Sequence, residues 1–260
     1  MKTRFKKRKL TFSSRFLGAA ILILAAILAL FHFVLLSGMF ELKNIKVVSQ
    51  ADIDEEEIKQ IIDKQLNKKF FRWLSIKPLF LISPAKISNE ILAKYPSIKR
   101  ANVQRKFPHS LVLTIKKRRA VGIWCQPKKD FCFLFDESRI IFEKIKKQQI
   151  NEELILIFSD DKDKKLGNEV LAPLTFSQIL EIEQSLKEID LTAESFWLTI
   201  LPLKELRVKL KKGWEIYFNL DKDVKLALSQ LRLVLKEEIP KQNWDNLEYI
   251  DLRFTKIYYK

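Results

Sequence analysis

The feature that most constrains this chain is an apolar run near its N-terminus. No Lys, Arg, Asp, Glu or Pro occurs between Phe16 and Leu36. At about 1.5 Å per helical residue, such a run spans the roughly 30 Å hydrocarbon core of a bilayer. We therefore predict a single transmembrane helix at residues 16–38.

The charges beside this run predict its orientation. Residues 1–15 are rich in Lys and Arg and contain no acid, whereas Glu41 follows the run. Because basic segments stay in the cytoplasm, residues 1–15 are predicted to be a cytoplasmic tail and the C-terminal part to be extracytoplasmic. A cleaved signal peptide is the competing interpretation, but its apolar core is usually about 7 to 15 residues long and ends at small residues.

The net charge does not indicate nucleic-acid binding. The chain carries 48 Lys and Arg against 32 Asp and Glu, which gives +16. Acidic residues are interleaved with basic ones beyond residue 39, a pattern typical of a solvated mixed-charge surface. The predicted non-protein partner is the bilayer, and a modest attraction to anionic lipid or cell-wall polymer stays open.

Residues 40–119 have the pattern of a small α+β module in the order strand, helix, helix, strand, strand. Two helices can cover one face of a small sheet, so this length suffices for a compact domain. The turn before the last strand contains Pro108. The segments are an extended run at 42–48, helices at 55–66 and from 83 to 96, and strands at 98–105 and 111–116.

A basic and aromatic segment at 68–82 lies between the two predicted helices. It includes Phe70, Phe71, Arg72 and Trp73. Two interpretations are open: a loop that covers the core, or a segment that contacts the membrane surface.

Residues 120–260 predict a mainly antiparallel β domain with two covering helices, at 176–189 and 224–237. Asp136-Glu137-Ser138 and Lys211-Lys212-Gly213 have the composition of turns. The last predicted strands are 249–254 and 257–259. The complete fold class is therefore α+β: a transmembrane helix, a βααββ module and a β domain.

The two cysteines, Cys125 and Cys132, lie between extended runs on the predicted extracytoplasmic side. A hairpin would bring them face to face, where a disulfide could form. Their redox state stays open at this level. Two thiols without a nearby His or second pair supply too few ligands for a metal site.

No active site is evident. Five glycines leave no phosphate-binding loop or dinucleotide fingerprint, so neither a cofactor nor a small-molecule substrate is predicted. His109 follows Pro108 in a turn and has no nucleophile motif to activate, so we interpret it as a surface residue. Acid pairs such as Asp160-Asp161 and Glu237-Glu238 do not by themselves form a glycosidase site.

Three passages carry a resemblance to a known family. They are Phe40 to Val47, Tyr95 to Leu111 (YPSIKRANVQRKFPHSL), and Tyr249 to Phe254 (YIDLRF). Together with the basic tail, the span and the β-rich region, they resemble the FtsQ/DivIB family of bacterial cell-division proteins over almost the whole chain. Lys117-Arg118-Arg119-Ala120 stands where relatives usually have a Glu and a Pro.

The resemblance implies a non-enzymatic scaffold at the division septum, with a POTRA module at 40–119 and an FtsQ-type β domain at 120–260. It implies binding of FtsB-like and FtsL-like bitopic proteins and control of septal peptidoglycan synthesis. Partner binding would use the edge of the final strand. The residues carried over are Phe254, Thr255, Lys256, Ile257, Tyr258 and Tyr259.

An edge strand suits this role because its unpaired backbone groups accept a partner strand, while aromatic side chains anchor it. Asp251 and Arg253 are interpreted instead as a local polar lock. The alternative functions are a POTRA-containing transport or secretion component, which would need further modules or a barrel, and a wall-modifying enzyme.

Overall fold

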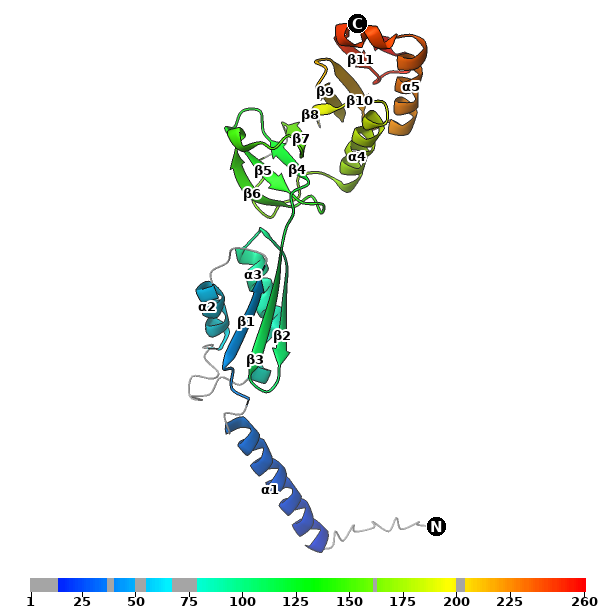
Figure 1. Cartoon of the computed structure of the whole chain (residues 1–260). Helices are drawn as coiled ribbons and strands as arrows, with labels where there is room; N and C mark the ends of the chain where they lie inside the picture. Colours follow the sequence, from blue (N-terminus) through cyan, green and yellow to red (C-terminus); the bar gives the residue numbers. More distant parts are fainter. Residues whose placement is uncertain (1–13, 37–39, 50–54, 67–78, 161–162, 200–203) are drawn as a thin grey trace, which may run out of the picture. The chain divides into compact units, whose positions relative to one another are not determined.

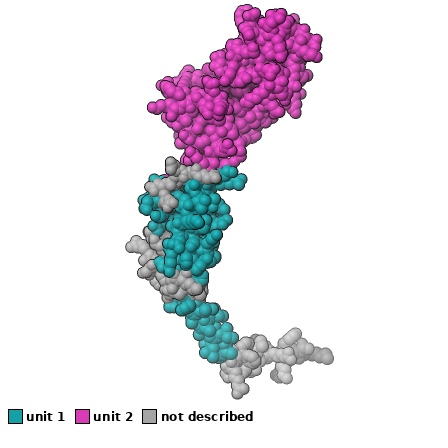
Figure 2. Space-filling view, viewed as in Figure 1, with its two compact units in different colours: residues 1–93, 100–116 teal, residues 94–99, 117–260 magenta. Residues whose placement is uncertain are grey.

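The computed structural model describes residues 14–36, 40–49, 55–66, 79–160, 163–199 and 204–260 (Figure 1). The chain divides into two compact units, residues 1–93 with 100–116 and residues 94–99 with 117–260 (Figure 2). Each unit contains helices and at least one β-sheet, so the predicted α+β class is confirmed.

The N-terminal helix α1 comprises Ser14–Leu36. Large apolar side chains such as Leu22 and Phe33 are exposed on it. Among the described residues, no helix combines the length and apolarity that a membrane crossing requires. The transmembrane helix at 16–38 therefore stays a prediction.

The first unit also contains a three-stranded sheet in the order β1-β3-β2. β1 and β3 are parallel, with Asn44 opposite Ser110 and Ser49 opposite Ile115. The predicted order of strand, helix, helix, strand, strand is confirmed. The elements are β1 (Asn44–Ser49), α2 (Glu55–Leu66), the short 3-10 helix η2 (Leu79–Leu81), α3 (Pro84–Lys94), β2 (Ile98–Lys106) and β3 (Ser110–Lys117).

One face of this sheet is buried. In β3, Leu111, Leu113 and Ile115 are buried, and they alternate with more exposed residues. Alternate strand positions share a face, so these side chains need an apolar cover. α2 and α3 supply buried isoleucines for it, among them Ile58 and Ile87.

Most of the basic and aromatic segment lies outside the described residues, which resume at Leu79. Leu79 and Ile82 are buried. The contact of the 68–82 segment with the membrane surface stays a prediction.

The second unit is built on a nine-stranded sheet in the order β12-β11-β10-β9-β8-β7-β4-β5-β6. Five strand pairs are antiparallel and three are parallel. The strands are β4 (Gly122–Cys125), β5 (Phe131–Phe135), β6 (Ile141–Lys146), β7 (Ile155–Ser159), β8 (Ala193–Thr199), β9 (Glu205–Leu210), β10 (Glu215–Asn219), β11 (Tyr249–Asp251) and β12 (Tyr258–Tyr259).

Two helices connect parallel neighbours in this sheet. α4 (Pro173–Lys187) lies in the chain between β7 and β8, and α5 (Val224–Glu237) between β10 and β11. Parallel strands require such crossovers. α4 begins three residues before the predicted start, because proline fits the first helical turn. Two further 3-10 helices are η3 (Lys147–Gln149) and η4 (Lys241–Asn246).

The main core lies between these helices and one face of the sheet. Phe196, Val208 and Ile216 from the central strands are buried with Ile182 of α4 and Leu231 of α5. Figure 1 shows both helices beside these strands. Asp223 caps α5, since its carboxylate accepts hydrogen bonds from two backbone N–H groups of the first turn.

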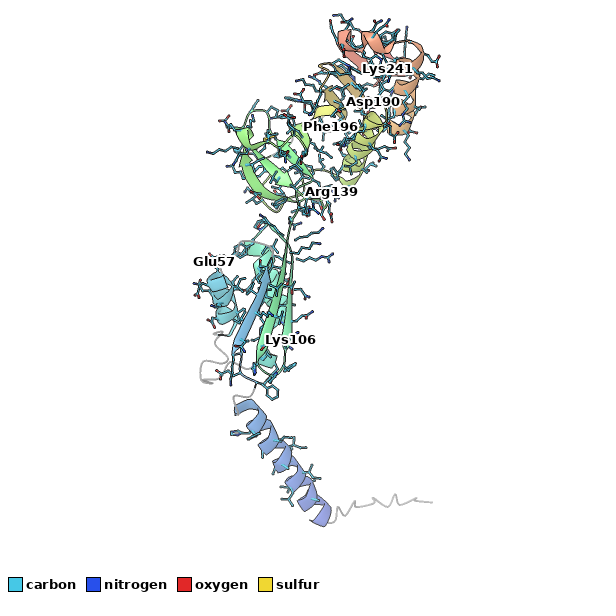
Figure 3. The ribbon with its side chains drawn as sticks, in the orientation of Figure 1. Glu57, Lys106, Arg139, Asp190, Phe196 and Lys241 are labelled. Atoms are coloured by element: carbon cyan, nitrogen blue, oxygen red, sulfur yellow. A yellow bond between two sulfur atoms is a disulfide. The ribbon has the colours of Figure 1, made fainter. Side chains whose placement is uncertain are left out.

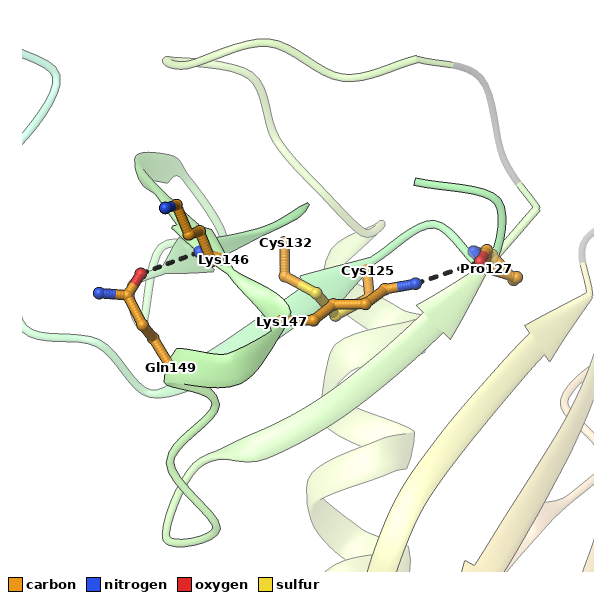
Figure 4. Close-up of a disulfide and its surroundings, with 6 residues drawn as sticks. All are labelled: Cys125, Pro127, Cys132, Lys146, Lys147 and Gln149. Carbon is orange, nitrogen blue, oxygen red and sulfur yellow. Dashed lines mark hydrogen bonds between the residues drawn. A yellow bond between two sulfur atoms is a disulfide. The ribbon is translucent and has the colours of Figure 1, made fainter. Parts of the chain in front are cut away.

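The opposite face carries a small second cluster near β4 and β5. Cys125 and Cys132 are directly opposite each other and are joined by a disulfide (Figure 4). Both are fully buried with Ile123. Beside them, Lys147 donates a hydrogen bond of 3.2 Å to the carbonyl of Pro127.

Arg118, within the passage that departs from the family pattern, has a structural role. Its Nη1 lies 2.5 Å from Oδ2 of the buried Asp136, and its Nε donates to the carbonyl of Pro96. Asp136 also accepts from the backbone N–H groups of Ser138 and Ile140. The buried carboxylate is thus paired, as burial of a charge requires.

Gly122 provides a test of the packing around β4. A Cβ at this position would lie 2.3 Å from the ring of Phe135 and 2.9 Å from the carbonyl oxygen of Ile155. We expect Gly122→Ala to lower the free energy of unfolding by about 1 to 3 kcal/mol through overpacking. Urea unfolding of the purified chain measures this change.

The double variant with Phe135→Leu is the control, because it removes the ring atoms that clash. We expect Gly122→Ala to cost less in that background than in the wild type. An equal cost in both backgrounds would contradict the contact as its cause.

Candidate protein-binding edge

The path of the C-terminal segment is fixed by an ion pair between Asp251 and Arg253. Asp251 Oδ1 accepts from both the backbone N–H and the Nε of Arg253 at 3.0 Å, and Oδ2 accepts from Nη2 at 2.7 Å. Arg253 Nη1 also donates to Glu205 at 3.0 Å. The predicted local polar lock is confirmed, and it bends the chain directly after β11.

This bend corrects the predicted strand at 249–254. β11 ends at Asp251, and Phe254, Thr255, Lys256 and Ile257 lie in the bend rather than in a strand. The lock explains the early end, since the carboxylate takes up the N–H of Arg253.

The last strand of the sheet, β12, contains Tyr258 and Tyr259. Tyr258 lies opposite Asp251, and Tyr259 lies opposite Ile250. Lys260 extends the pairing, because its N–H and C=O both bond to Tyr249, at 3.2 and 3.3 Å. Within the described sheet, no strand pairs with the outer side of β12.

The backbone of Tyr259 faces this free side. In an antiparallel pair, residues alternate between those that bond to the neighbouring strand and those that point away. Lys260 bonds to β11, so the preceding N–H and C=O, those of Tyr259, point outward. They are open to a further strand.

Aromatic side chains surround the free side. Phe254, Tyr258 and Tyr259 are each about half exposed. The rings of Phe254 and Tyr258 meet edge to face at 6.2 Å, and Lys256 lies 5.8 Å from the Tyr258 ring. Ile257 instead packs partly against the main core. Five of the six predicted residues are therefore exposed at one place, and Ile257 anchors them.

A row of side chains extends from this edge across the sheet, one from each of six neighbouring strands. Members of the row are direct cross-strand partners, so they share the face opposite α4 and α5. They are Phe158, Trp197, Arg207, Tyr217, Asp251 and Tyr258.

This face carries stacked rings and cations next to rings. Phe158 and Trp197 stack at 4.4 Å, and Arg207 and Arg253 lie 5.5 and 5.1 Å from the ring of Tyr217. A hollow of about 450 Å³ opens there, with Asp160 and Glu205 among its lining residues.

The pKa values of Tyr217 and Arg253 reflect these contacts. Burial raises the pKa of Tyr217, and the hydrogen bond and charge of Glu215 add to that shift. The hydrogen bonds that Arg253 donates to Asp251 raise the pKa of Arg253 above its ordinary value. Arg253 therefore stays charged at every accessible pH.

Sequence reasoning missed Trp197, Arg207 and Tyr217. Each occupies an outward position between two buried residues of its strand, as Trp197 does between Phe196 and Leu198. The alternation was visible in the sequence. Alignment of the three positions in one row requires the strand register, which the sequence did not supply.

The structure also places other residues singled out from the sequence. His109 is in the turn between β2 and β3, with Nδ1 3.2 Å from the hydroxyl of Ser110. Asp160 lines the hollow. Among the described residues, no cluster of three His, Cys, Asp or Glu side chains is placed to hold a metal ion.

Comparison with known families connects the first unit to cell division. The family model described as POTRA domain, FtsQ-type, matches residues 40–118. These residues form an FtsQ-type POTRA domain. The match supports an FtsQ/DivIB-family protein, as the resemblance implied. No curated protein matches the chain.

The POTRA domain indicates a role in cell division through protein–protein interactions. Its FtsQ-type family is a family of non-enzymatic division proteins.

The lock can be tested with Asp251→Asn. The amide keeps one acceptor but loses the charge and the second acceptor that Arg253 uses. We expect a loss of about 1 to 3 kcal/mol in the free energy of unfolding and faster amide exchange in residues 249–260. Mass-detected hydrogen exchange and urea unfolding measure the two effects.

Asp245→Asn is the matched control, because Asp245 pairs with Lys212 at the surface. It should change stability by less than about 0.5 kcal/mol. Equal effects of the two variants would contradict the lock.

The pKa of Tyr217 predicts an alkaline effect. Its pKa is raised in the folded state, so its contribution to stability is complete below the unfolded pKa of about 10 and falls as pH rises through the folded pKa. The melting temperature of Tyr217→Phe should decline less steeply above pH 10 than that of the wild type. Parallel curves would show that Tyr217 does not contribute.

Proposed function

We propose that this chain is a bitopic membrane scaffold of the bacterial division machinery. Its extracytoplasmic part would bind FtsB-like and FtsL-like proteins and so help to control septal peptidoglycan synthesis and septum assembly. The FtsQ-type POTRA domain supports a division role. The open edge at β12 is the observation that supports partner binding.

The edge offers both parts of a strand-addition site. The outward N–H and C=O of Tyr259 would pair with the backbone of an incoming strand. Phe254 and Tyr258 would contact its side chains, because they are exposed and already held against each other. Rigid aromatic anchors lose little conformational freedom on binding.

The row beside the edge would extend the contact area. Arg207 and Arg253 present cations next to the aromatic rings of Trp197 and Tyr217. A partner segment that continued from the added strand across this face could place acidic or apolar side chains there.

Membrane anchoring completes the proposal. Residues 16–38 would span the membrane, residues 1–15 would stay in the cytoplasm, and the POTRA domain (40–119) and β domain (120–260) would lie outside it. The apolar run and the basic tail support this topology. The disulfide supports it too, since disulfides persist in oxidising compartments. The POTRA domain would contribute to recruitment at the septum.

Tyr259→Pro tests the edge most sharply. Proline removes the N–H that faces the free side and leaves the bonds between Lys260 and Tyr249 available. The affinity for the extracytoplasmic segment of the FtsB-like protein should fall at least about tenfold, the equivalent of 1.4 kcal/mol. Titration of the full-length chain in nanodiscs measures it.

Tyr259→Ala is the control, because it removes the same side chain and keeps the N–H. It should bind more tightly than Tyr259→Pro, with the same melting temperature. Wild-type affinity in a folded Tyr259→Pro variant would reject strand addition at this edge.

A further inference from the structure

The turn between β2 and β3 projects an apolar side chain. We call residues 106–109 the hairpin tip. Phe107 in this tip is 61% exposed, and it is one of two large apolar side chains, with Val48, that the described residues of the first unit expose beyond α1. One exposed phenylalanine is ordinary on a protein surface, so its location decides what it means.

The hairpin tip is held next to the start of β1. The carbonyl of His109 accepts hydrogen bonds from the N–H groups of Lys43 and Asn44, at 2.9 and 3.3 Å. The rings of Phe40 and Phe107 meet edge to face with centroids 6.2 Å apart. The tip and the beginning of the POTRA domain therefore move as one body.

Chain length then places the tip relative to the proposed membrane span. The span ends at residue 38, so Phe40 is at most about 7 Å farther along the chain. The headgroup layer on each side of the hydrocarbon core is of similar thickness, about 5 to 8 Å. Whatever the angle between α1 and the POTRA domain, Phe40 stays within about 7 Å of the end of the span. The ring of Phe107 lies 6.2 Å from that of Phe40, so it is within reach of the headgroup layer.

The charges around the tip fit an anionic surface. Four basic residues and one acid, Glu41, occur in the two segments that meet there, 40–46 and 104–110. The bases are Lys43, Lys46, Arg105 and Lys106. Lys43, Lys46 and Lys106 are exposed, and Figure 3 labels Lys106 at this end of the hairpin. The guanidinium of Arg105 is held by the carbonyl of Ile82.

We propose that the hairpin tip docks on the outer surface of the membrane, with Phe107 in the headgroup layer and Lys43 and Lys106 on anionic lipid phosphates. An aromatic ring flanked by lysines is suited to this interface. Docking holds the POTRA domain against the bilayer. This inference rests on the proposed membrane span.

Spin labels on the full-length chain in nanodiscs test the docking. Single cysteines replace Phe107, Asn102 on β2, or Leu28 in α1, and the Cys125–Cys132 disulfide stays oxidised. The nitroxide at 107 resembles phenylalanine in size and polarity. For each label, the relative accessibility to oxygen and to a water-soluble nickel complex reports its depth in the membrane. The lipids are phosphatidylcholine alone or mixed with phosphatidylglycerol.

We expect the label at 28 to report hydrocarbon, the label at 107 to report the headgroup layer in anionic nanodiscs, and the label at 102 to report water. The change Lys43→Glu with Lys106→Glu should shift the label at 107 toward water in anionic nanodiscs only. A buried label at 28 with a water-exposed label at 107 would overturn the docking alone. A water-exposed label at 28 would overturn the membrane span as well.

The depth of the label at 107 could also be the same with and without anionic lipid, and with and without the two Lys→Glu changes. That result would overturn the electrostatic contact.

Discussion

A β-sheet that does not close must end in strands with unpaired backbone groups, and this constraint shapes the second unit. The sheet ends at β6 on one side and at the two residues of β12 on the other. Long open edges invite uncontrolled pairing, and a very short edge strand limits that risk. β12 leaves the outward N–H and C=O of Tyr259 unpaired within the described sheet, which the proposed strand addition requires.

The short edge stays in place because the chain before it is fixed. Asp251 and Arg253 end β11 and turn the chain, Ile257 is tied to the core, and Lys260 bonds back to Tyr249. The edge is therefore already formed in the chain alone. Preorganisation of this kind reduces the conformational entropy lost on binding.

Much of the fold could be predicted from residue patterns. The alternation of Leu111, Leu113 and Ile115 predicted a strand with one buried face, and the spacing of Leu228, Leu231 and Leu235 predicted α5. Both are confirmed. The residue pattern did not predict the three parallel strand pairs of the second sheet. Pairing between strands that are distant in the chain depends on the path of the crossovers.

The candidate site was predicted less completely. The exposed aromatics of the last residues and the lock at Arg253 followed from the local sequence. The row from Phe158 to Tyr258 did not, since its members are scattered over about 100 residues and meet only through strand register. The early end of β11 was missed because apolar pattern does not reveal a side chain that takes up a backbone N–H.

The backbone amide of Tyr259 gives the most direct test of the account. Residue-resolved hydrogen exchange can be measured on the chain alone and with the FtsB-like segment bound. Strand addition predicts fast exchange of this amide in the free chain and strong protection in the complex. Unchanged, fast exchange at Tyr259 in the saturated complex would contradict the account.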